Sequence, residues 1–293
     1  MKLRYTMLII MLPLLALVGY FLFAEYRFLS GGEARTKATA EAAQETTELY
    51  KVISQVQRER GLSVGAISSD GKNFKPELAK QRQAVNAAIA AMPPEFNELS
   101  AAAPEQIRAF LDGIEKFTTW RVRVDSGAIT VNEVVELCSA TVDAGLQATA
   151  QRLVGGETET LTALSQARSM LALAKEYAGQ ERSGVLAVIV SGTISKEIVE
   201  RIVYFRAMQE FAIRRAADVL GDDALARRLL ADPAAGSIGK SREIVLDAAF
   251  GGPLANLTGS EWFAGALAWL AAIAAVEDLL GDRLCSLSLK VAD

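Results

Sequence analysis

The sequence of 293 residues contains no histidine. This absence excludes histidine-based general acid–base catalysis, activation of a serine or cysteine nucleophile by imidazole, and imidazole metal ligands. Cysteine is also scarce. Cys138 and Cys285 can form one disulfide if the chain leaves the cytoplasm, or serve as two small buried apolar residues. Without a nucleophile elbow, a phosphate-binding loop or a carboxylate cluster in the sequence, we expect no enzyme, no cofactor and no bound metal.

The sequence also lacks a strong charge of either sign and a strong β-strand signal. The formal net charge is −4, and no block of lysine or arginine stands out, so we expect no nucleic-acid partner. Proline occurs only 7 times, while 51% of the residues are hydrophobic. Apolar residues recur at helical spacing and nowhere alternate over a long stretch. The sequence therefore predicts an all-α fold.

The longest uncharged run lies at the N-terminus, over residues 6–24. It is long enough to cross a bilayer, and no small-x-small cleavage site follows it. Lys2 and Arg4 precede the run, which keeps the N-terminus in the cytoplasm by the positive-inside rule. We therefore predict a cytoplasmic tip and signal anchor over 1–28, in the cytoplasmic (inner) membrane, with the rest of the chain outside the cytoplasm. A shorter uncharged run, 262–276, is predicted to be a helix packed in a bundle.

The remainder is predicted to form one helical domain over 29–290, with a first half of about 35–155 and a second half of about 157–290. Thr130 with Glu133 is a capping box that opens a helix, and Ser195 is a helix cap. The segment between 221 and 239 is interpreted as broken, because it contains Asp232-Pro233 and two glycines. The expected helices are 35–68, 76–92, 104–125, 130–154, 157–190, 195–220, 240–250 and 260–287.

Two arginines lie within apolar helix faces. Arg60 shares a face with residues such as Val56 and Val64, and Arg182 shares one with Ala178 and Leu186. An unpaired buried guanidinium costs several kcal/mol, so each arginine needs an anionic or acceptor partner. Two interpretations remain open at this stage.

In the structural interpretation, the two halves pack so that the Glu-Arg pairs cross, with Arg60 on Glu181 and Arg182 on Glu59. In the functional interpretation, the arginines converge on a small anion. Guanidinium is planar and forked, which suits a planar oxyanion such as nitrate or a carboxylate.

These residues carry a resemblance to a known family. QRERGLS, at 57–63, resembles the Gln-x-Glu-Arg-Gly-x-Ser motif of the nitrate- and nitrite-sensing (NIT) domain. KEYAGQER, at 175–182, resembles its second motif, Lys-Glu-x-x-Gly-x-Glu-Arg, although Ser183 replaces the alanine that usually follows. A tryptophan-containing helix that ends in Val-Glu-Asp, at 262–278, is similar to the helix that closes the domain.

The resemblance implies two packed four-helix bundles that share long helices, with the anion bound by arginines. Arg60 and Arg182 match the motifs. The third arginine matches Arg242 best, with Arg206 as a rival.

The resulting hypothesis is an extracytoplasmic sensor of a bacterial receptor, such as a chemoreceptor, for nitrate or nitrite. It would pass a helix shift to the membrane anchor. We also expect a homodimer and an output domain or partner beyond this chain. The alternative is a membrane-anchored interaction module in which the Glu-Arg motifs form structural salt bridges.

Overall fold

The computed structural model describes residue 20 and residues 41–92, 105–152, 159–254 and 257–292. Within these ranges the chain consists of helices and connecting turns, without a β-strand, so the predicted all-α class is confirmed. Apart from Tyr20, the predicted membrane anchor lies outside the described residues. The division into two four-helix bundles and the halves 35–155 and 157–290 stay predictions.

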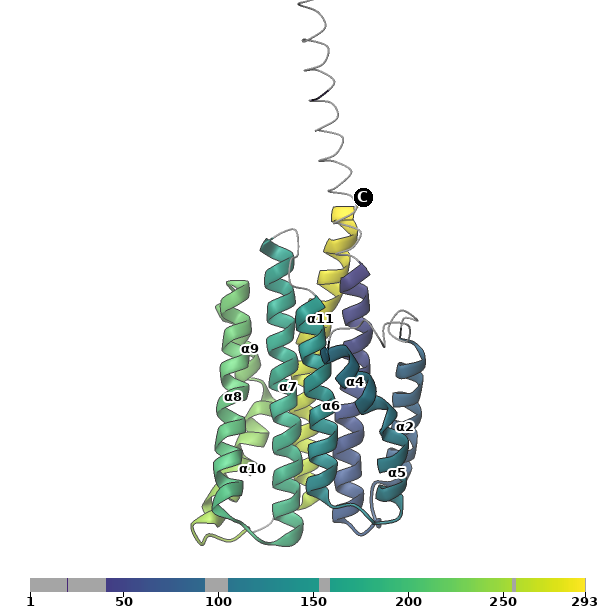
Figure 1. Ribbon diagram of the computed structural model, residues 1–293. Coiled ribbons are helices and arrows are strands. Elements are labelled where there is room, and N and C mark those ends of the chain that lie inside the picture. Colours follow the sequence, from purple (N-terminus) through teal and green to yellow (C-terminus); the bar gives the residue numbers. More distant parts are fainter. Residues whose placement is uncertain (1–19, 21–40, 93–104, 153–158, 255–256, 293) are drawn as a thin grey trace, which may run out of the picture.

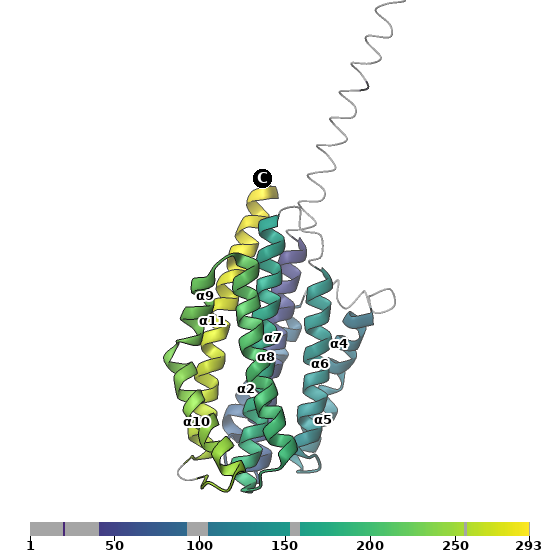
Figure 2. The same cartoon turned by 90° about the vertical axis from the view of Figure 1, so that its left-hand side faces the viewer.

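The helices run up and down along a common axis (Figures 1 and 2). The first long helix, 41–68, is purple in Figure 1 and is called the 41–68 helix below. The elements of the first half that follow are α2 (Lys75–Ala90), α4 (Glu105–Glu115), α5 (Phe117–Asp125) and α6 (Val131–Arg152). Those of the second half are α7 (Glu159–Ser191), α8 (Lys196–Leu220), α9 (Asp223–Leu230), α10 (Pro233–Ala249) and α11 (Gly259–Ala292).

Two predicted helix starts are confirmed by their hydrogen bonds. The Glu133 carboxylate accepts from the Thr130 backbone N–H at 2.8 Å, and the Thr130 hydroxyl accepts from the Glu133 N–H at 3.2 Å. This is the reciprocal pattern of a capping box. Through these hydrogen bonds and the one from Arg123, the pKa of Glu133 falls to about 2. The Ser195 hydroxyl accepts from the Ile198 N–H at 3.4 Å and caps α8.

The predicted break between 221 and 239 was wrong. Helix α9 occupies 223–230, and α10 begins at Pro233 and not near Lys240. The Asp232 carboxylate accepts from the Ala234 N–H at 2.8 Å, and Pro233 takes the first helical position. Asp-Pro is here a helix start, because proline has no N–H to leave unpaired at that position. The predicted helix 104–125 is likewise divided, into α4 and α5.

One hydrophobic core extends through both halves of the sequence. Helix α7 lies within it and packs against α6, α8 and α11. Trp262, Trp269 and Ile273 are buried, which agrees with the prediction of a bundle helix over 262–276.

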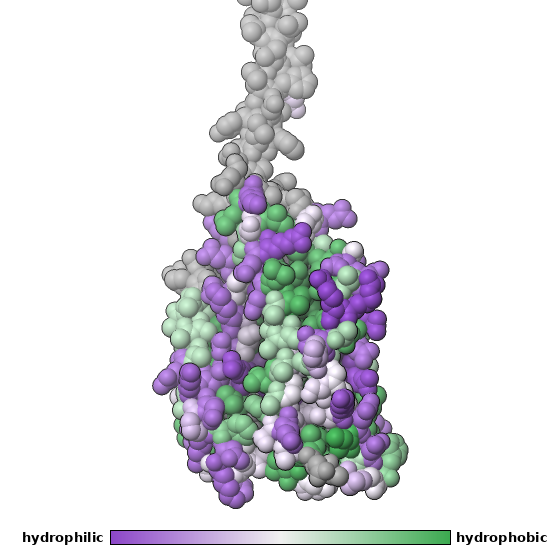
Figure 3. Space-filling model, turned by 180° about the vertical axis from the view of Figure 1, so that it is seen from behind, coloured by the Kyte–Doolittle hydropathy of each residue, from purple (hydrophilic) through white to green (hydrophobic). Residues whose placement is uncertain are grey.

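By length and composition alone, the part of α11 over Gly259–Lys290 is also apolar enough to cross a membrane. In the bundle, its outer face carries exposed small residues that include Ala264, Ala268, Ala271 and Ala275. Seen from behind, the molecule shows green, apolar side chains down its middle with hydrophilic side chains on either side (Figure 3).

Candidate functional site

The two motif helices, the 41–68 helix and α7, approach each other through reciprocal arginine–glycine contacts. The guanidinium of Arg60 lies against Gly179, where an added Cβ would stand 2.5 Å from its Nη2. The guanidinium of Arg182 lies against Gly61, where an added Cβ would overlap it. The glycine of each motif therefore leaves room for the arginine of the other. Both arginines are buried, with exposed fractions of 0% and 2%.

Both terminal nitrogens of the Arg60 guanidinium have polar partners, and one partner is a carboxylate. Its Nη1 lies 2.5 Å from Glu176 Oε1, its Nη2 donates to Glu176 Oε2 at 3.1 Å, and Nη1 also donates to the Ser139 hydroxyl at 2.6 Å. The carboxylate further accepts from Gln57 at 3.0 Å and from Gln180 at 2.7 Å. Burial lowers the pKa of Arg60, but the charge and hydrogen bonds of Glu176 more than offset it, so the pKa is raised overall. This pair is a buried salt bridge, in which the Arg60 Nε alone has no hydrogen-bond partner among the described residues.

Arg182 is different, because no carboxylate of the described residues forms an ion pair with it. Its Nη2 donates to the Gln57 backbone oxygen at 3.2 Å, and its guanidinium lies 4.9 Å from the centre of the Phe263 ring. Its Nε is buried and has no hydrogen-bond partner among the described residues. Burial, and then the positive charges of Arg60 and Arg58, lower the pKa of Arg182 to about 9. Among the described residues, the guanidinium is therefore a buried cation without a paired carboxylate.

Arg182 opens onto a cavity of about 380 Å³ between the 41–68 helix, α7 and α11, which we call the Arg182 cavity. Three cationic residues line it, and the described lining residues include no carboxylate. Its outer wall is apolar and comes from α11. The lining residues are Ser54, Gln55, Gln57, Arg58, Lys175, Gly179, Arg182, Leu267, Leu270, Ala271 and Ala274.

Lys175 and Arg58 are the cavity cations that the sequence interpretation missed. Lys175 is buried, donates to the Ser54 hydroxyl at 2.7 Å and pairs with Glu277 of α11 at 2.5 Å. Arg58 is exposed and lies near enough to Arg182 to lower its pKa. The signal for Lys175 was present in the sequence: it precedes Arg182 by seven residues, about two turns of α7, which places both on one face.

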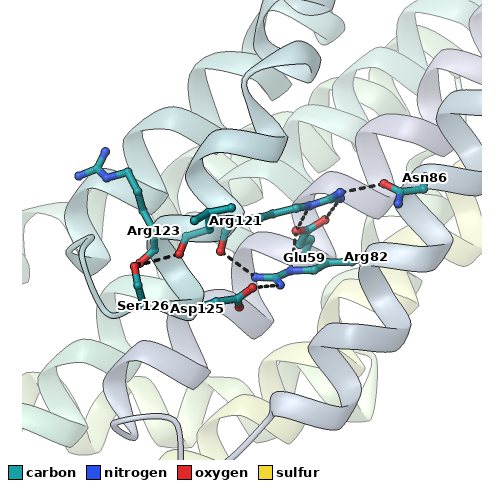
Figure 4. A network of polar contacts seen from close by, with 8 residues as sticks. Glu59, Arg82, Asn86, Arg121, Arg123, Asp125 and Ser126 are labelled. Atoms are coloured by element: carbon teal, nitrogen blue, oxygen red, sulfur yellow. Dashed lines mark hydrogen bonds and ion pairs between the residues drawn. The ribbon is translucent and has the colours of Figure 1, made fainter.

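The crosswise salt bridges of the structural interpretation were wrong. Glu59 does not meet Arg182; it accepts from Arg121 at 2.8 and 2.7 Å, and Arg82 approaches it at 3.5 Å (Figure 4). Arg82 also donates to Asp125 at 2.8 Å. The reason is geometric, because a glutamate one position before the arginine points about 100° away around the helix. Glu59 therefore faces α2 and α5 and not the crossing.

Glu181 does not meet Arg60 either. Its carboxylate accepts two hydrogen bonds of 2.6 Å from Arg242 of α10, and Gln209 of α8 donates to it at 2.8 Å. Arg242 lines a separate cavity of about 170 Å³ together with Arg206 and others. Arg206 is exposed and its Nε lies 3.4 Å from Glu210. The structure therefore brings Arg60 and Arg182 together and places both Arg242 and Arg206 outside the Arg182 cavity.

The two cysteines are free in the structure, so the predicted alternative of a disulfide between them was wrong. Cys138 is buried, and this burial raises the pKa of its thiol to about 12. Cys285 lies on α11, where its sulfur is 3.5 Å from the Thr47 hydroxyl. The other interpretation, a small buried apolar residue, is confirmed for Cys138, whereas Cys285 is only half-buried.

Comparison with known proteins assigns the sequence to a family. The sequence profile of the NIT family, described as nitrate and nitrite sensing, matches residues 51–284. No sequence among the curated proteins matches the chain. The solved structure of the NasR transcription antiterminator superimposes with a TM-score of 0.72 at 19% identity, and covers 92% of this chain and 74% of that chain. At this identity the likeness shows the fold alone, while the profile covers both arginine motifs. The chain therefore belongs to the nitrate- and nitrite-sensing (NIT) family.

Proposed function

We propose that this chain is a sensor domain that binds a small oxyanion, nitrate or nitrite, in the Arg182 cavity. The observation that carries the proposal is the buried guanidinium of Arg182, which has no carboxylate partner among the described residues. Its cavity adds Arg58 and Lys175 and, among its described lining residues, no negative charge. A bound anion would supply the missing counter-charge.

The chemistry of the cavity fits a planar oxyanion. A guanidinium donates two parallel hydrogen bonds to two oxygens of one anion, which matches nitrate, nitrite and carboxylate. The volume of about 380 Å³ holds an anion of a few atoms with several waters, since each water takes about 30 Å³. Binding in this site would therefore exchange water for charge-assisted hydrogen bonds from Arg182.

The three arginines expected from the sequence take different roles in this proposal. Arg182 contacts the anion directly. Arg60 holds the crossing through Glu176 and adds positive potential beside Arg182. Arg242 supports the site indirectly, because it holds Glu181, the neighbour of Arg182 on α7.

We further propose that residues 6–24 anchor the chain in the inner membrane, that the sensor domain is extracytoplasmic, and that the receptor is a homodimer. The signal would then be a rigid-body shift of the helices nearest the membrane, as in other two-state receptors. The family description supports the sensing role and names the ligand class.

Calorimetric titration tests the proposal. The 293-residue chain in detergent is titrated with sodium nitrate and sodium nitrite, with sodium chloride at equal ionic strength as the control. We expect saturable binding of nitrate or nitrite that Arg182→Met abolishes. If neither oxyanion binds at millimolar concentration, the named ligands are wrong. If binding survives in both Arg60→Met and Arg182→Met, the site is wrong.

The interaction-module alternative makes the opposite prediction for the same protein. In that case the arginines act only as structural cations, and nitrate leaves the melting temperature unchanged. The carboxylate pairs of Arg60 and Arg242 suit this alternative, but the unpaired guanidinium of Arg182 does not.

A further inference from the structure

Three buried cations lie on one face of α7 at intervals of seven residues. Arg168, Lys175 and Arg182 are 3%, 5% and 2% exposed. They meet Thr47, Ser54 and Gly61 of the 41–68 helix, which are also seven residues apart. Because seven residues are close to two helical turns, the three cations form a row along the seam between these helices.

Helix α11 closes this seam and contributes a carboxylate to it. Glu277 is 1% exposed, and its Oε2 lies 2.5 Å from Lys175 Nζ. One turn further along, Gly281 lies against the guanidinium of Arg168, 2.8 Å from Cζ to an added Cβ. One turn before Glu277, Ala274 lines the Arg182 cavity. Lys175 therefore stands between the cavity and the carboxylate of α11.

Lys175 can interact either with Glu277 or with an anion in the Arg182 cavity. A lysine ammonium has three donors; one goes to the Ser54 hydroxyl, while Glu277 Oε2 forms an ion pair with Lys175 that lacks hydrogen-bond geometry. Both Lys175 and Ser54 line the cavity. The Ser54 hydroxyl, whose oxygen accepts from Lys175, keeps its own proton free to donate. An anion in the cavity would thus find a hydroxyl donor, Ser54, and a cation, Lys175, that contact each other.

We propose that Lys175 is a ligand-binding residue of the Arg182 cavity and that Glu277 is the intramolecular competitor for it. When an oxyanion binds, Lys175 turns from Glu277 to the anion, and the attachment of α11 to α7 at this point weakens. Arg168, which has no carboxylate ion pair among the described residues, offers the released Glu277 carboxylate a second cation one turn away. Anion binding is thereby coupled to the C-terminal part of α11. This inference rests on the proposed function.

The test is a nitrate titration of Glu277→Gln, with Asp278→Asn as the matched control. Both substitutions remove one negative charge from α11, but Asp278 is exposed and lies one position away from the seam. Removing the competitor is expected to raise nitrate affinity about five- to tenfold, at the lower end of typical coupling between sites. The control is expected to stay within about twofold of wild type, as for independent sites. Equal affinities in wild type, Glu277→Gln and Asp278→Asn would overturn the proposal.

Hydrogen exchange in the C-terminal part of α11 gives a second readout. Hydrogen exchange of residues 277–290 is expected to rise on addition of nitrate to the wild type, because Glu277 then loses Lys175. In Lys175→Met/Glu277→Gln, which removes both members of this ion pair and leaves neither charge without its partner, nitrate should not change that exchange. If exchange in the double variant still rises with nitrate, the coupling does not pass through this pair. Where wild type binds neither nitrate nor nitrite, the proposed function itself fails; where it binds and these variants behave like wild type, only this inference fails.

Discussion

The guanidinium of Arg182 fills the space that any side chain at Gly61 would need. Arg60 stands in the same relation to Gly179. The glycine in each motif is thus explained by the arginine of the other motif and not by backbone conformation, since neither glycine has a positive φ. These two reciprocal arginine–glycine contacts set how closely the 41–68 helix and α7 approach each other.

Substitution of Gly61 by alanine tests this relation. The added methyl group is expected to displace Arg182, lower the free energy of unfolding by about 1–3 kcal/mol as overpacking does, and weaken nitrate binding. Gly184→Ala is the control on the same helix as Arg182, because nothing lies within 4 Å of an added Cβ there. Alanine favours helix over glycine, so the control should gain up to about 1 kcal/mol. Chemical denaturation measures both; a Gly61→Ala variant as stable as Gly184→Ala would contradict the crossing.

The two motif arginines are expected to differ in their effect on stability without anion. Arg60→Met leaves the Glu176 carboxylate buried and without its cation, so it should lower the free energy of unfolding by about 3–5 kcal/mol. Arg182→Met removes a buried charge that has no carboxylate partner in the described part of the chain. It should therefore change that free energy by less than about 1 kcal/mol, or raise it. Urea denaturation in chloride buffer measures both. An equal loss for the two variants would show that Arg182 has a counter-charge within the fold.

Nitrate affinity is expected to depend on alkaline pH through Arg182. Its pKa of about 9 lies below the ordinary value of 12.5, and only the protonated guanidinium attracts an anion. Affinity should therefore be constant below pH 8 and fall above pH 9, by about tenfold per unit where one proton is linked to binding. The chain has no histidine to titrate between pH 6 and 8. Calorimetry from pH 7 to pH 10.5 checks this, and a constant affinity across that range would contradict the assigned pKa.

Arg242 is expected to matter for stability more than for binding. Arg242→Met strands the buried Glu181 carboxylate and should lower the free energy of unfolding by about 3–5 kcal/mol. Arg206→Met, in an exposed pair, should change it by less than about 1 kcal/mol. Thermal denaturation gives the stabilities, and nitrate titration of folded Arg242→Met should give an affinity within about twofold of wild type. A loss of binding as large as that of Arg182→Met would make Arg242 a direct ligand.

The sequence predicted the helical class and the burial of the two motif arginines on apolar helix faces, because both depend on local periodicity. Helix starts with a side-chain cap, such as Thr130 and Ser195, were also predictable from neighbouring residues. Asp232-Pro233 was misread for the same local reason, since it resembles a turn as closely as it resembles a helix start.

The partners of the buried charges were not predictable from the motifs alone. Glu59 and Glu181 could have paired across the crossing, and only the packing of α5 and α10 assigns them to Arg121 and Arg242. Likewise, Glu176 was within a motif, yet its contact with Arg60 depends on the relative height of two helices. Ion pairing is decided by tertiary contacts, whereas the position of a charge on a helix face is decided by spacing.

A crystal structure of the chain grown with millimolar nitrate tests the central claim most directly. The account predicts planar density in the Arg182 cavity, with oxygen atoms about 2.7–3.2 Å from the Arg182 guanidinium nitrogens. Under the same conditions Arg60 should stay on Glu176. An empty cavity beside an unchanged Arg182, or nitrate bound only elsewhere, would contradict it.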